Sequence, residues 1–353
     1  MDDTKMTRRD AFGLAGVAAT AAAGAALTPA TAQAASTGRK KKIDFVTKID
    51  FKDPKWTRDT YARLDADVEP GKEKCGWIRG KIFGVRDNEA VRPLMNVEGF
   101  SFVRINRLPD GSWRRLLREV VFYRDLETNE ILKEWTNPYT GERVKVVPIA
   151  NDPFNFTISE FVPEPPSYGG MQVVKREPKP FLQDWQWGPE GTMILNTGID
   201  MIYPNALRPD VWPRESSGWM NRVSEQFIYV VKKADVENPN LTHIPHTGSW
   251  SRITPWLPWM MMGQAPGHMS YFTHFSTIPN GIAGLPADLV AAARAMDEKW
   301  LHAPETDYGP SLSSLENYSR EQKPSPIPNG WSVPQPPAPK GPFPPRPPLN
   351  SKP

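Results

Sequence analysis

Apolar and polar residues alternate with a period of two along most of the chain, and this pattern constrains the fold more than any other feature. Successive side chains of a β-strand point to opposite faces of a sheet, so the pattern is typical of strands. The segments that show it are 76–85, 99–108, 112–126, 130–137, 142–151, 154–161, 191–203, 223–233 and 269–278. Asp110-Gly111 predicts a tight hairpin turn, and NPYTG at 137–141 predicts another. One helix is expected, over 286–302, where Pro286 precedes apolar residues at helical spacing.

So many antiparallel strands with a single late helix predict a mainly β fold. We expect a lipocalin-like antiparallel β-barrel that is closed or nearly closed, because closure removes the unpaired strand edges that promote aggregation. A β-sandwich is the alternative. We place this single domain, with its C-terminal helix, at residues 56–306. Cys75 is the only cysteine, which excludes an internal disulfide, and we expect it to be a half-buried structural thiol.

The first 34 residues have the pattern of an export signal. A basic start containing Arg8 and Arg9 is followed by an Ala/Gly-rich apolar stretch and by Ala32-Gln33-Ala34, which is typical of a cleavage site. The paired arginines predict a twin-arginine signal at residues 1–34, and therefore the twin-arginine export machinery as a partner and the periplasm as the location. A short membrane anchor is the alternative, but we expect no stable membrane span in the mature protein. Residues 35–55 are interpreted as a flexible basic lead-in.

The C-terminal end is rich in proline, which disrupts the interior of helices and of central β-strands. We interpret residues 307–353 as a disordered tail, and we expect its removal after Lys323 to leave thermal stability unchanged. A ligand for a proline-reading partner is the alternative function of this segment. The formal net charge is +3 and no basic stripe is present, so we expect no nucleic-acid partner.

Polar residues on the predicted strand 112–126 are candidates for a site. Glu119 and Tyr123 share one face of that strand, and a packed core would not tolerate such a polar face. A barrel wide enough to hold a ligand would tolerate it. The Asp110-Gly111 turn places Arg104 on the neighbouring strand, where an arginine would keep a carboxylate ionised. The alternative is that these residues form the solvated outer face.

The runs REVVFYRDLETNEILKEWTNPYTGERVKVVPIANDPFNF and SWSRITPWLPWMMMGQAPGHMSYF resemble a family of exported proteins known as a domain of unknown function (number 1838). The similarity covers the chain from about residue 56 to residue 306, and its most specific pieces are WTNPYTGE and PWLPWMMMGQAPG. The resemblance implies a shared fold and a fixed turn at NPYTGE. It implies no activity and no catalytic residues.

The second of these runs is unusually rich in tryptophan and methionine. Such side chains suit a pocket for bulky apolar or aromatic molecules, because tryptophan offers a broad amphipathic face and methionine adapts its shape. The predicted substrate-binding residues are Trp250, Trp256, Trp259, Met261 and His268. The alternative is a segment that plugs the mouth of the barrel and belongs to the core.

Histidine is the side chain best suited to proton transfer near neutral pH. His274 lies on the predicted strand 269–278 and is a candidate general base, with a purely structural histidine as the alternative. His243 and His246 form an HxxH pair, but Pro245 separates them and no acidic third ligand is close in sequence. We therefore expect no metal site, and a metal-dependent hydrolase built on this pair is a third and distant hypothesis.

Several enzyme classes lack their motifs here, among them serine esterases with GxSxG, P-loop nucleotidases and dinucleotide-dependent oxidoreductases. We therefore predict an enzyme without a cofactor that performs acid/base lyase or isomerase chemistry on a bulky aromatic or lipophilic small molecule. Its predicted catalytic residues are Glu119, Tyr123, His274 and Arg104. The alternative is a protein that binds or carries such an apolar molecule without changing it. An enzyme needs an acid and a base that converge on one ligand, whereas a carrier needs only a polar anchor.

Overall fold

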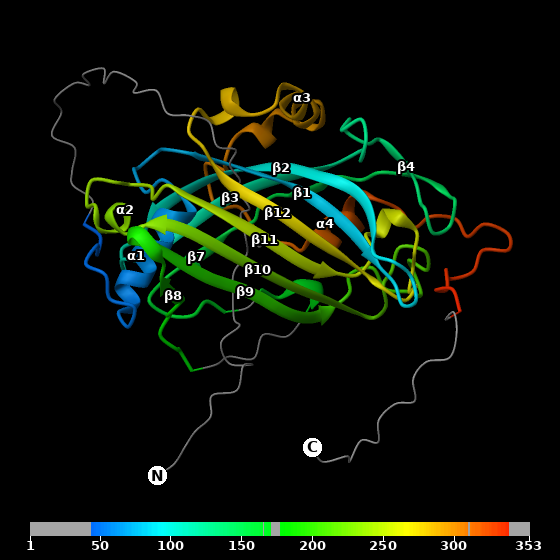
Figure 1. Ribbon diagram of the computed structural model, residues 1–353, viewed down its shortest axis with the longest axis horizontal. Helices are drawn as coiled ribbons and strands as arrows, with labels where there is room; N and C mark the ends of the chain where they lie inside the picture. Colours follow the sequence, from blue (N-terminus) through cyan, green and yellow to red (C-terminus); the bar gives the residue numbers. More distant parts are fainter. Residues whose placement is uncertain (1–43, 165, 171–176, 310, 339–353) are drawn as a thin grey trace, which may run out of the picture.

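One large antiparallel sheet dominates the fold (Figure 1). The computed structural model describes residues 44–338 except 165, 171–176 and 310. The predicted signal at 1–34, residues 35–43 of the basic lead-in and residues 339–353 of the predicted tail lie outside the described residues. The fold is mainly β, as the alternation of the sequence predicts.

Ten strands form the large sheet in the order β6-β3-β2-β1-β12-β11-β10-β9-β8, with β7 beside β3. Their bounds are β1 Lys74–Val85, β2 Arg92–Arg107, β3 Trp113–Arg124, β6 Ile149–Asn151, β7 Phe156–Ile158, β8 Asp184–Trp187, β9 Thr192–Pro204, β10 Met220–Lys232, β11 His246–Thr254 and β12 His268–Ile278. A separate hairpin consists of β4 Glu134–Thr136 and β5 Arg143–Lys145. All the described strand pairs are antiparallel.

Four α-helices accompany the sheet in the described part of the chain: α1 Pro54–Asp65, α2 Lys233–Glu237, α3 Ala287–Met296 and α4 Ser314–Glu321. The 3-10 turns are η1 Tyr168–Gly170, η2 Pro189–Gly191, η3 Pro258–Met260, η4 Gly281–Gly284 and η5 Glu298–Leu301. The predicted helix is found as α3 followed by η5. Both predicted turns are also present: Gly111 has a positive φ of 85°, and the amide of Gly141 donates to the carbonyl of Asn137 over 2.8 Å.

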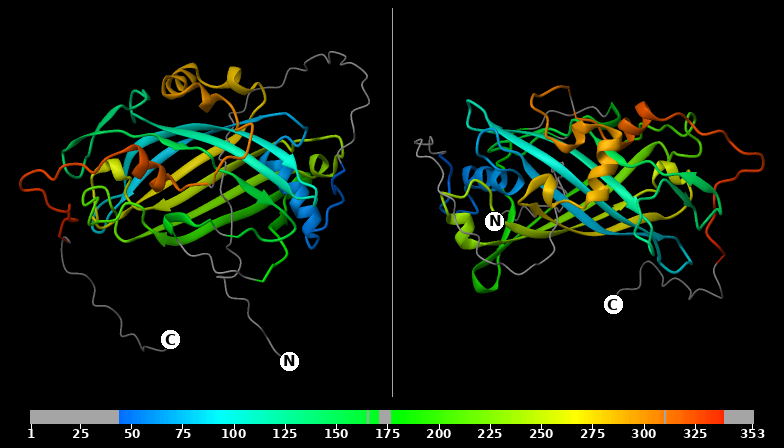
Figure 2. Two further views of the ribbon diagram at one scale, coloured as in Figure 1. Left: turned by 180° about the vertical axis from the view of Figure 1, so that it is seen from behind. Right: turned by 90° about the horizontal axis from the view of Figure 1, so that it is seen from above.

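The two faces of the sheet have different coverings. On β3, Leu117 and Tyr123 pack into the main core, whereas Val120 and Phe122 face the opposite way. These outward residues pack against α3 and η5, which lie over β1, β2 and β3 (Figure 2). Because both faces of β3 are buried, apolar residues occur on both faces of the strand and its sequence does not alternate simply between apolar and polar.

The sheet curls around an interior. Glu119 of β3 and Glu225 of β10 are close enough for their charges to interact, although β2, β1, β12 and β11 separate the two strands in the sheet. Helix α1 lies at one end of this interior, where Trp56 contacts Trp185 and Asp65 forms a 2.6 Å ion pair with Arg115. In the described part of the chain, no ladder joins the edge strand β8 to β6 or β7. The structure therefore shows a curled antiparallel sheet, and it does not show closure into a barrel.

The two segments predicted to be unstructured differ from that expectation where they are described. Phe45 and Phe51 pack against the core, and the amide of Val46 donates to Asp59 over 3.0 Å. The chain after 307 forms α4, and the amide of Ser325 donates to Glu215 over 2.7 Å. The described residues 311–338 thus contact the body, among others through Tyr318, Ser325 and Trp331.

Cys75 is buried, and burial raises the pKa of its thiol to about 12, which agrees with a structural role. Among the helices that the structure describes, none has the length and hydropathy needed to cross a membrane.

Candidate functional site

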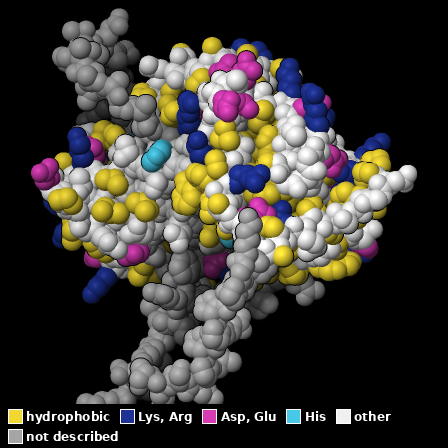
Figure 3. Space-filling view, turned by 45° about the vertical axis from the view of Figure 1, so that its right-hand side comes forward, with side chains coloured by type: hydrophobic (Ala, Val, Ile, Leu, Met, Phe, Trp, Pro, Cys, Tyr) yellow, Lys and Arg dark blue, Asp and Glu magenta, His cyan; other side chains and the backbone are white. Residues whose placement is uncertain are grey.

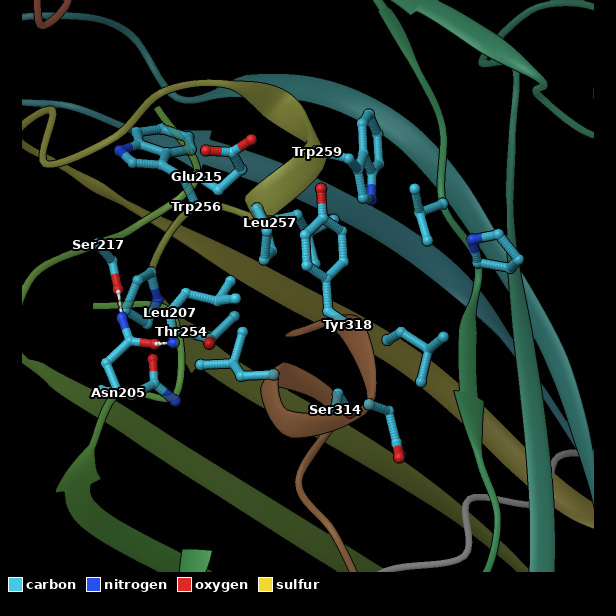
Figure 4. A pocket seen from close by; sticks show the side chains of 18 of the residues that line it. Asn205, Leu207, Glu215, Ser217, Thr254, Trp256, Leu257, Trp259, Ser314 and Tyr318 are labelled. Atoms are coloured by element: carbon cyan, nitrogen blue, oxygen red, sulfur yellow. Dashed lines mark hydrogen bonds between the residues drawn. The ribbon is translucent and has the colours of Figure 1, made fainter. Parts of the chain in front are cut away.

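A pocket opens at the end of the sheet where β9 and β11 finish and β10 begins (Figure 4). Segments 147–150, 205–217 and 255–259 and helix α4 complete its wall. The empty space is about 810 Å³ when the open mouth is included. A space of this order is typical of small-molecule sites. Figure 3, in which the right-hand side of Figure 1 comes forward, shows apolar side chains gathered on this face with charged ones around them.

The outer part of the pocket is apolar and aromatic. Trp256 and Leu257 line it from the segment that follows β11, and Tyr318 lines it from α4. Figure 4 shows Tyr318 standing between Leu257 and Trp259. The ring of Tyr318 is also supported from outside the pocket by Trp212, at a centroid distance of 5.8 Å. This part of the pocket therefore provides flat aromatic walls.

The inner end of the pocket is polar, and Arg252 of β11 is its central side chain. In the sheet register, Arg252 lies between Glu225 of β10 and Tyr271 of β12. Its Nε is 3.3 Å from a carboxylate oxygen of Glu225, and its guanidinium carbon is 5.9 Å from the centre of the Tyr271 ring. Tyr123 approaches from β3, and its ring centre is 5.1 Å from that of Trp259. Four strands and one loop thus bring a base, a cation and two phenols to one place.

Burial changes the protonation of these groups. It raises the pKa of Tyr123 well above its ordinary value and the pKa of Tyr271 to about 12, so both phenols stay protonated at neutral pH. Burial also raises the pKa of Glu225, while the neighbouring charge of Arg252 acts in the opposite direction. The inner end therefore holds a carboxyl group suited to accept a proton and phenols suited to donate a hydrogen bond.

Glu119 faces the same interior from β3. The amide of Asn151 donates to its carboxylate over 2.6 Å, and Asn317 of α4 donates to Asn151 over 3.0 Å. Burial raises the pKa of Glu119 to about 7, although the hydrogen bond from Asn151 lowers it. Tyr123 is four residues further along the strand, about 13 Å away. Glu119 and Tyr123 share the interior, but they are too far apart to exchange one proton directly.

The β4-β5 hairpin holds the pocket wall in place. Asn137 is fully buried, and its amide nitrogen donates to the carbonyl of Met260 over 2.8 Å. The rings of Trp135 and Trp259 meet edge to face at 5.7 Å. Glu142 of the same turn pairs with Arg214, whose carbonyl accepts from the amide of Gly263. The two sequence pieces most specific to the resembled family, WTNPYTGE and PWLPWMMMGQAPG, therefore form one wall.

Two predicted catalytic residues do not reach this interior, and the prediction that they converge with Glu119 is wrong. Arg104 lies opposite Leu116 in the ladder, on the outer side of the sheet with Phe102, and it pairs with Glu73. Glu119 lies opposite Ser101 instead. His274 is exposed on the outer face of β12, because the interior of that strand is occupied by the residues on either side of it. A period of two identifies residues that share a face, but it does not show which face points inward.

The predicted substrate-binding residues divide between the pocket and other places. Trp256 and Trp259 line the pocket. Trp250 is buried in the interior, stacked on Phe227. Met261 and His268 lie outside the lining: Met261 packs on the core at the end of η3, and His268 begins β12 opposite Val85.

The HxxH pair is used for structure. The ring nitrogens of His243 face the carbonyl of Arg63 at 3.1 Å and the hydroxyl of Thr277 at 3.0 Å. His246 Nδ1 faces the carbonyl of Ile244 at 2.9 Å. Among the described residues, no group of three or more His, Cys, Asp or Glu side chains is arranged to hold a metal ion.

Sequence reasoning missed Arg252, Glu225 and Tyr271. Arg252 lies in a segment whose tryptophans and prolines indicate a loop and obscure the short alternation of β11. Glu225 and Tyr271 lie in predicted strands, so alternation alone would have placed each of them on a face with buried aromatic neighbours. Their convergence depends on the curl of the sheet, which no local pattern reports.

A family model described as a protein of unknown function (DUF1838) matches residues 71–322 of the chain. A search of curated proteins gave no match. The match covers both family-specific pieces, the strands from β1 to β12 and the pocket-lining helix α4. The chain belongs to the DUF1838 family, for which no activity is established.

Proposed function

We propose that this protein is an enzyme that uses no cofactor and moves a proton on a small aromatic or lipophilic molecule, as a lyase or an isomerase does. One observation carries the proposal: a pocket with aromatic walls ends at Arg252, which pairs with Glu225 and adjoins Tyr271. Glu225 accepts a proton from a carbon atom of the substrate. The proton then returns at another carbon in an isomerase, or a neighbouring group leaves with the electron pair in a lyase.

In this proposal the curled sheet works as an incomplete barrel, with α1 at one end and the pocket at the other. The predicted location in the periplasm is part of the same proposal, and it rests on the pattern of residues 1–34. Of the catalytic residues predicted from the sequence, Tyr123 remains in the proposed site, where we assign it the role of a hydrogen-bond donor. Glu119 becomes a neighbouring group, because it contacts Asn151 and not the inner end of the pocket.

Deuterium exchange tests the proposal even when the substrate has not been identified. A small-molecule extract of the source cells is incubated with the protein in deuterium oxide and analysed by mass spectrometry. We expect the protein to add one mass unit to a specific compound, because a base that removes a carbon-bound proton returns a deuteron. Glu225→Gln should abolish this exchange, and Glu225→Asp should retain part of it, while circular dichroism checks that both variants fold.

A carrier is the second candidate, because α4 closes the pocket with Tyr318 and would suit retention of a ligand. A compound that copurifies with the protein and never exchanges its protons would favour the carrier. Exchange that persists unchanged in Glu225→Gln would remove Glu225 from the mechanism.

A further inference from the structure

The inner end of the pocket contains more hydrogen-bond donors than acceptors. Three buried donors lie there: the hydroxyls of Tyr123 and Tyr271 and the indole nitrogen of Trp259. Tyr123 interacts with the other two, and none of the three has a well-aligned hydrogen bond to any other described residue. Each of these residues is only 1% exposed. The three groups lie near one another, and a hydroxyl that accepted from a neighbour would still leave a donor hydrogen unused. A buried polar group without a partner costs about 1–3 kcal/mol, so such a group in a pocket points to a ligand that completes it.

The electric charge at this end is already balanced. The positive charge of Arg252 faces the carboxylate of Glu225 at 3.3 Å. Glu119 adds a further acidic group to the interior, and its carboxylate also feels both Glu225 and Arg252. A negatively charged ligand would therefore meet Glu225 beside the one cation at the pocket's end and would also feel Glu119 further along the interior. An uncharged acceptor fits this environment better than an anion does.

We propose that the inner end binds the carbonyl oxygen of an uncharged, small aromatic or lipophilic carbonyl compound. Tyr123, which lines the pocket, donates a hydrogen bond to that oxygen, and Tyr271 holds the Tyr123 hydroxyl from behind. Arg252 lies beside the oxygen, and the body of the compound lies between Trp256 and Tyr318. The proposal rests on the proposed function and names its substrate class.

The carbonyl site also fits the proposed proton transfer. When Glu225 removes a proton from the carbon next to the carbonyl group, the electron pair of that C–H bond moves to the oxygen and gives an enolate. The same donors stabilise the enolate more strongly than the ketone, because its oxygen carries more negative charge.

Aromatic probes of similar size test whether the site prefers an uncharged carbonyl oxygen. The probes are acetophenone, ethylbenzene, which has no oxygen, and benzoate, which is charged, with binding followed by tryptophan fluorescence. We expect acetophenone to bind at least about tenfold more tightly than ethylbenzene, or about 1.4 kcal/mol, and more tightly than benzoate. Equal binding of acetophenone and ethylbenzene, tighter binding of benzoate, or no binding of acetophenone at concentrations on the order of 10 mM would overturn the proposal.

Infrared spectroscopy of carbonyl-labelled acetophenone reports the hydrogen bonds directly. We expect the carbonyl stretch of the bound probe to lie at lower frequency than in an apolar solvent, and the shift to be largely lost in Tyr123→Phe/Tyr271→Phe. These changes remove two hydroxyls that interact with each other and with Trp259 and that have no well-aligned hydrogen bond to the rest of the described fold, so the fold should persist. Tyr229→Phe is the matched control, because Tyr229 is a buried tyrosine of β10 outside the pocket lining, and it should leave the shift unchanged. An unshifted band in the wild-type protein would contradict the proposal.

These results separate the two proposals. Carbonyl binding without any deuterium exchange would retain the carbonyl site and reject the enzyme. Exchange confined to compounds that have no carbonyl group would retain the enzyme and reject the carbonyl site.

Discussion

At the scale of single residues, Glu119 shows how burial links a side chain to pH. Its pKa in the folded protein is about 7, against an ordinary value of 4.5. The folded state therefore binds a proton more tightly than the unfolded state does. The contribution of Glu119 to stability is fully present below pH 4.5 and is lost as the pH rises through 7.

Glu119→Gln should remove this dependence, because glutamine keeps an oxygen for Asn151 but cannot ionise. We expect the variant to match the wild type near pH 5 and to exceed it near pH 8 by about 1–3 kcal/mol in the free energy of unfolding. Urea unfolding at the two pH values measures the difference. Glu130→Gln, at an exposed position after the same strand, is the control and should show no such change. A variant less stable than the wild type at pH 8 would show that the Glu119 charge is favourable in the fold.

At the scale of elements, the segment 311–338 has the largest consequence for the pocket. The guanidinium of Arg214 donates to the carbonyl of Pro326 over 3.0 Å and lies 5.9 Å from the centre of the Trp331 ring. The backbone amide of Ser325 donates a hydrogen bond to one carboxylate oxygen of the buried Glu215. This segment therefore supports the residues that stand behind the pocket wall.

Truncation after Lys323 should lower the free energy of unfolding by about 1–3 kcal/mol, because it removes the amide that Glu215 accepts from while that carboxylate stays buried. This outcome replaces the sequence-based expectation of no change. Thermal and urea unfolding provide the measurement. Truncation after Ala338 is the control, since it removes none of the described contacts. Identical stability of the two truncated proteins would show that the contacts of Ser325 and Trp331 contribute nothing.

The elements also show what a sequence pattern can and cannot predict. The long strands and α3 follow from local periodicity, and the Asp110-Gly111 turn follows from residue type. Helix α4 has a readable signal, since Ser313 and Glu316 form a capping box, but the surrounding prolines mask it. The inner end of the pocket has no such local signal, because Tyr123 and Arg252 meet only through the curl of the whole sheet.

At the scale of the whole molecule, the fold is compatible with export after folding. Its buried ion pairs join distant parts of the chain, such as Arg115 with Asp65 and Arg124 with Glu98, each at 2.6 Å. Separating the two partners of such a pair leaves an uncompensated buried charge, which is strongly unfavourable. The pairs therefore disfavour partly folded states in which only one partner is in place. With a single cysteine, which is buried, the chain forms no internal disulfide, so the proposed export would not have to precede one.

Replacing Arg8 and Arg9 with lysine should leave the precursor in the cytoplasm, because a twin-arginine pathway recognises the paired arginines. Cell fractionation and immunoblotting detect the retained, uncleaved form. Arg39→Lys lies after the predicted signal and should not affect export. Unchanged export of the double variant would exclude the twin-arginine assignment.

The contact between Asn137 and Met260 also has a consequence for protein engineering. A chimera that takes the β4-β5 hairpin from one relative and the η3 loop from another would have to recreate the Trp135–Trp259 contact and the pair of Glu142 with Arg214 by chance. The hairpin, the η3 loop and the Arg214 segment should therefore be transplanted as a single cassette. A graft of the loop alone would transfer one part of the pocket wall without the hairpin contacts that hold it in place.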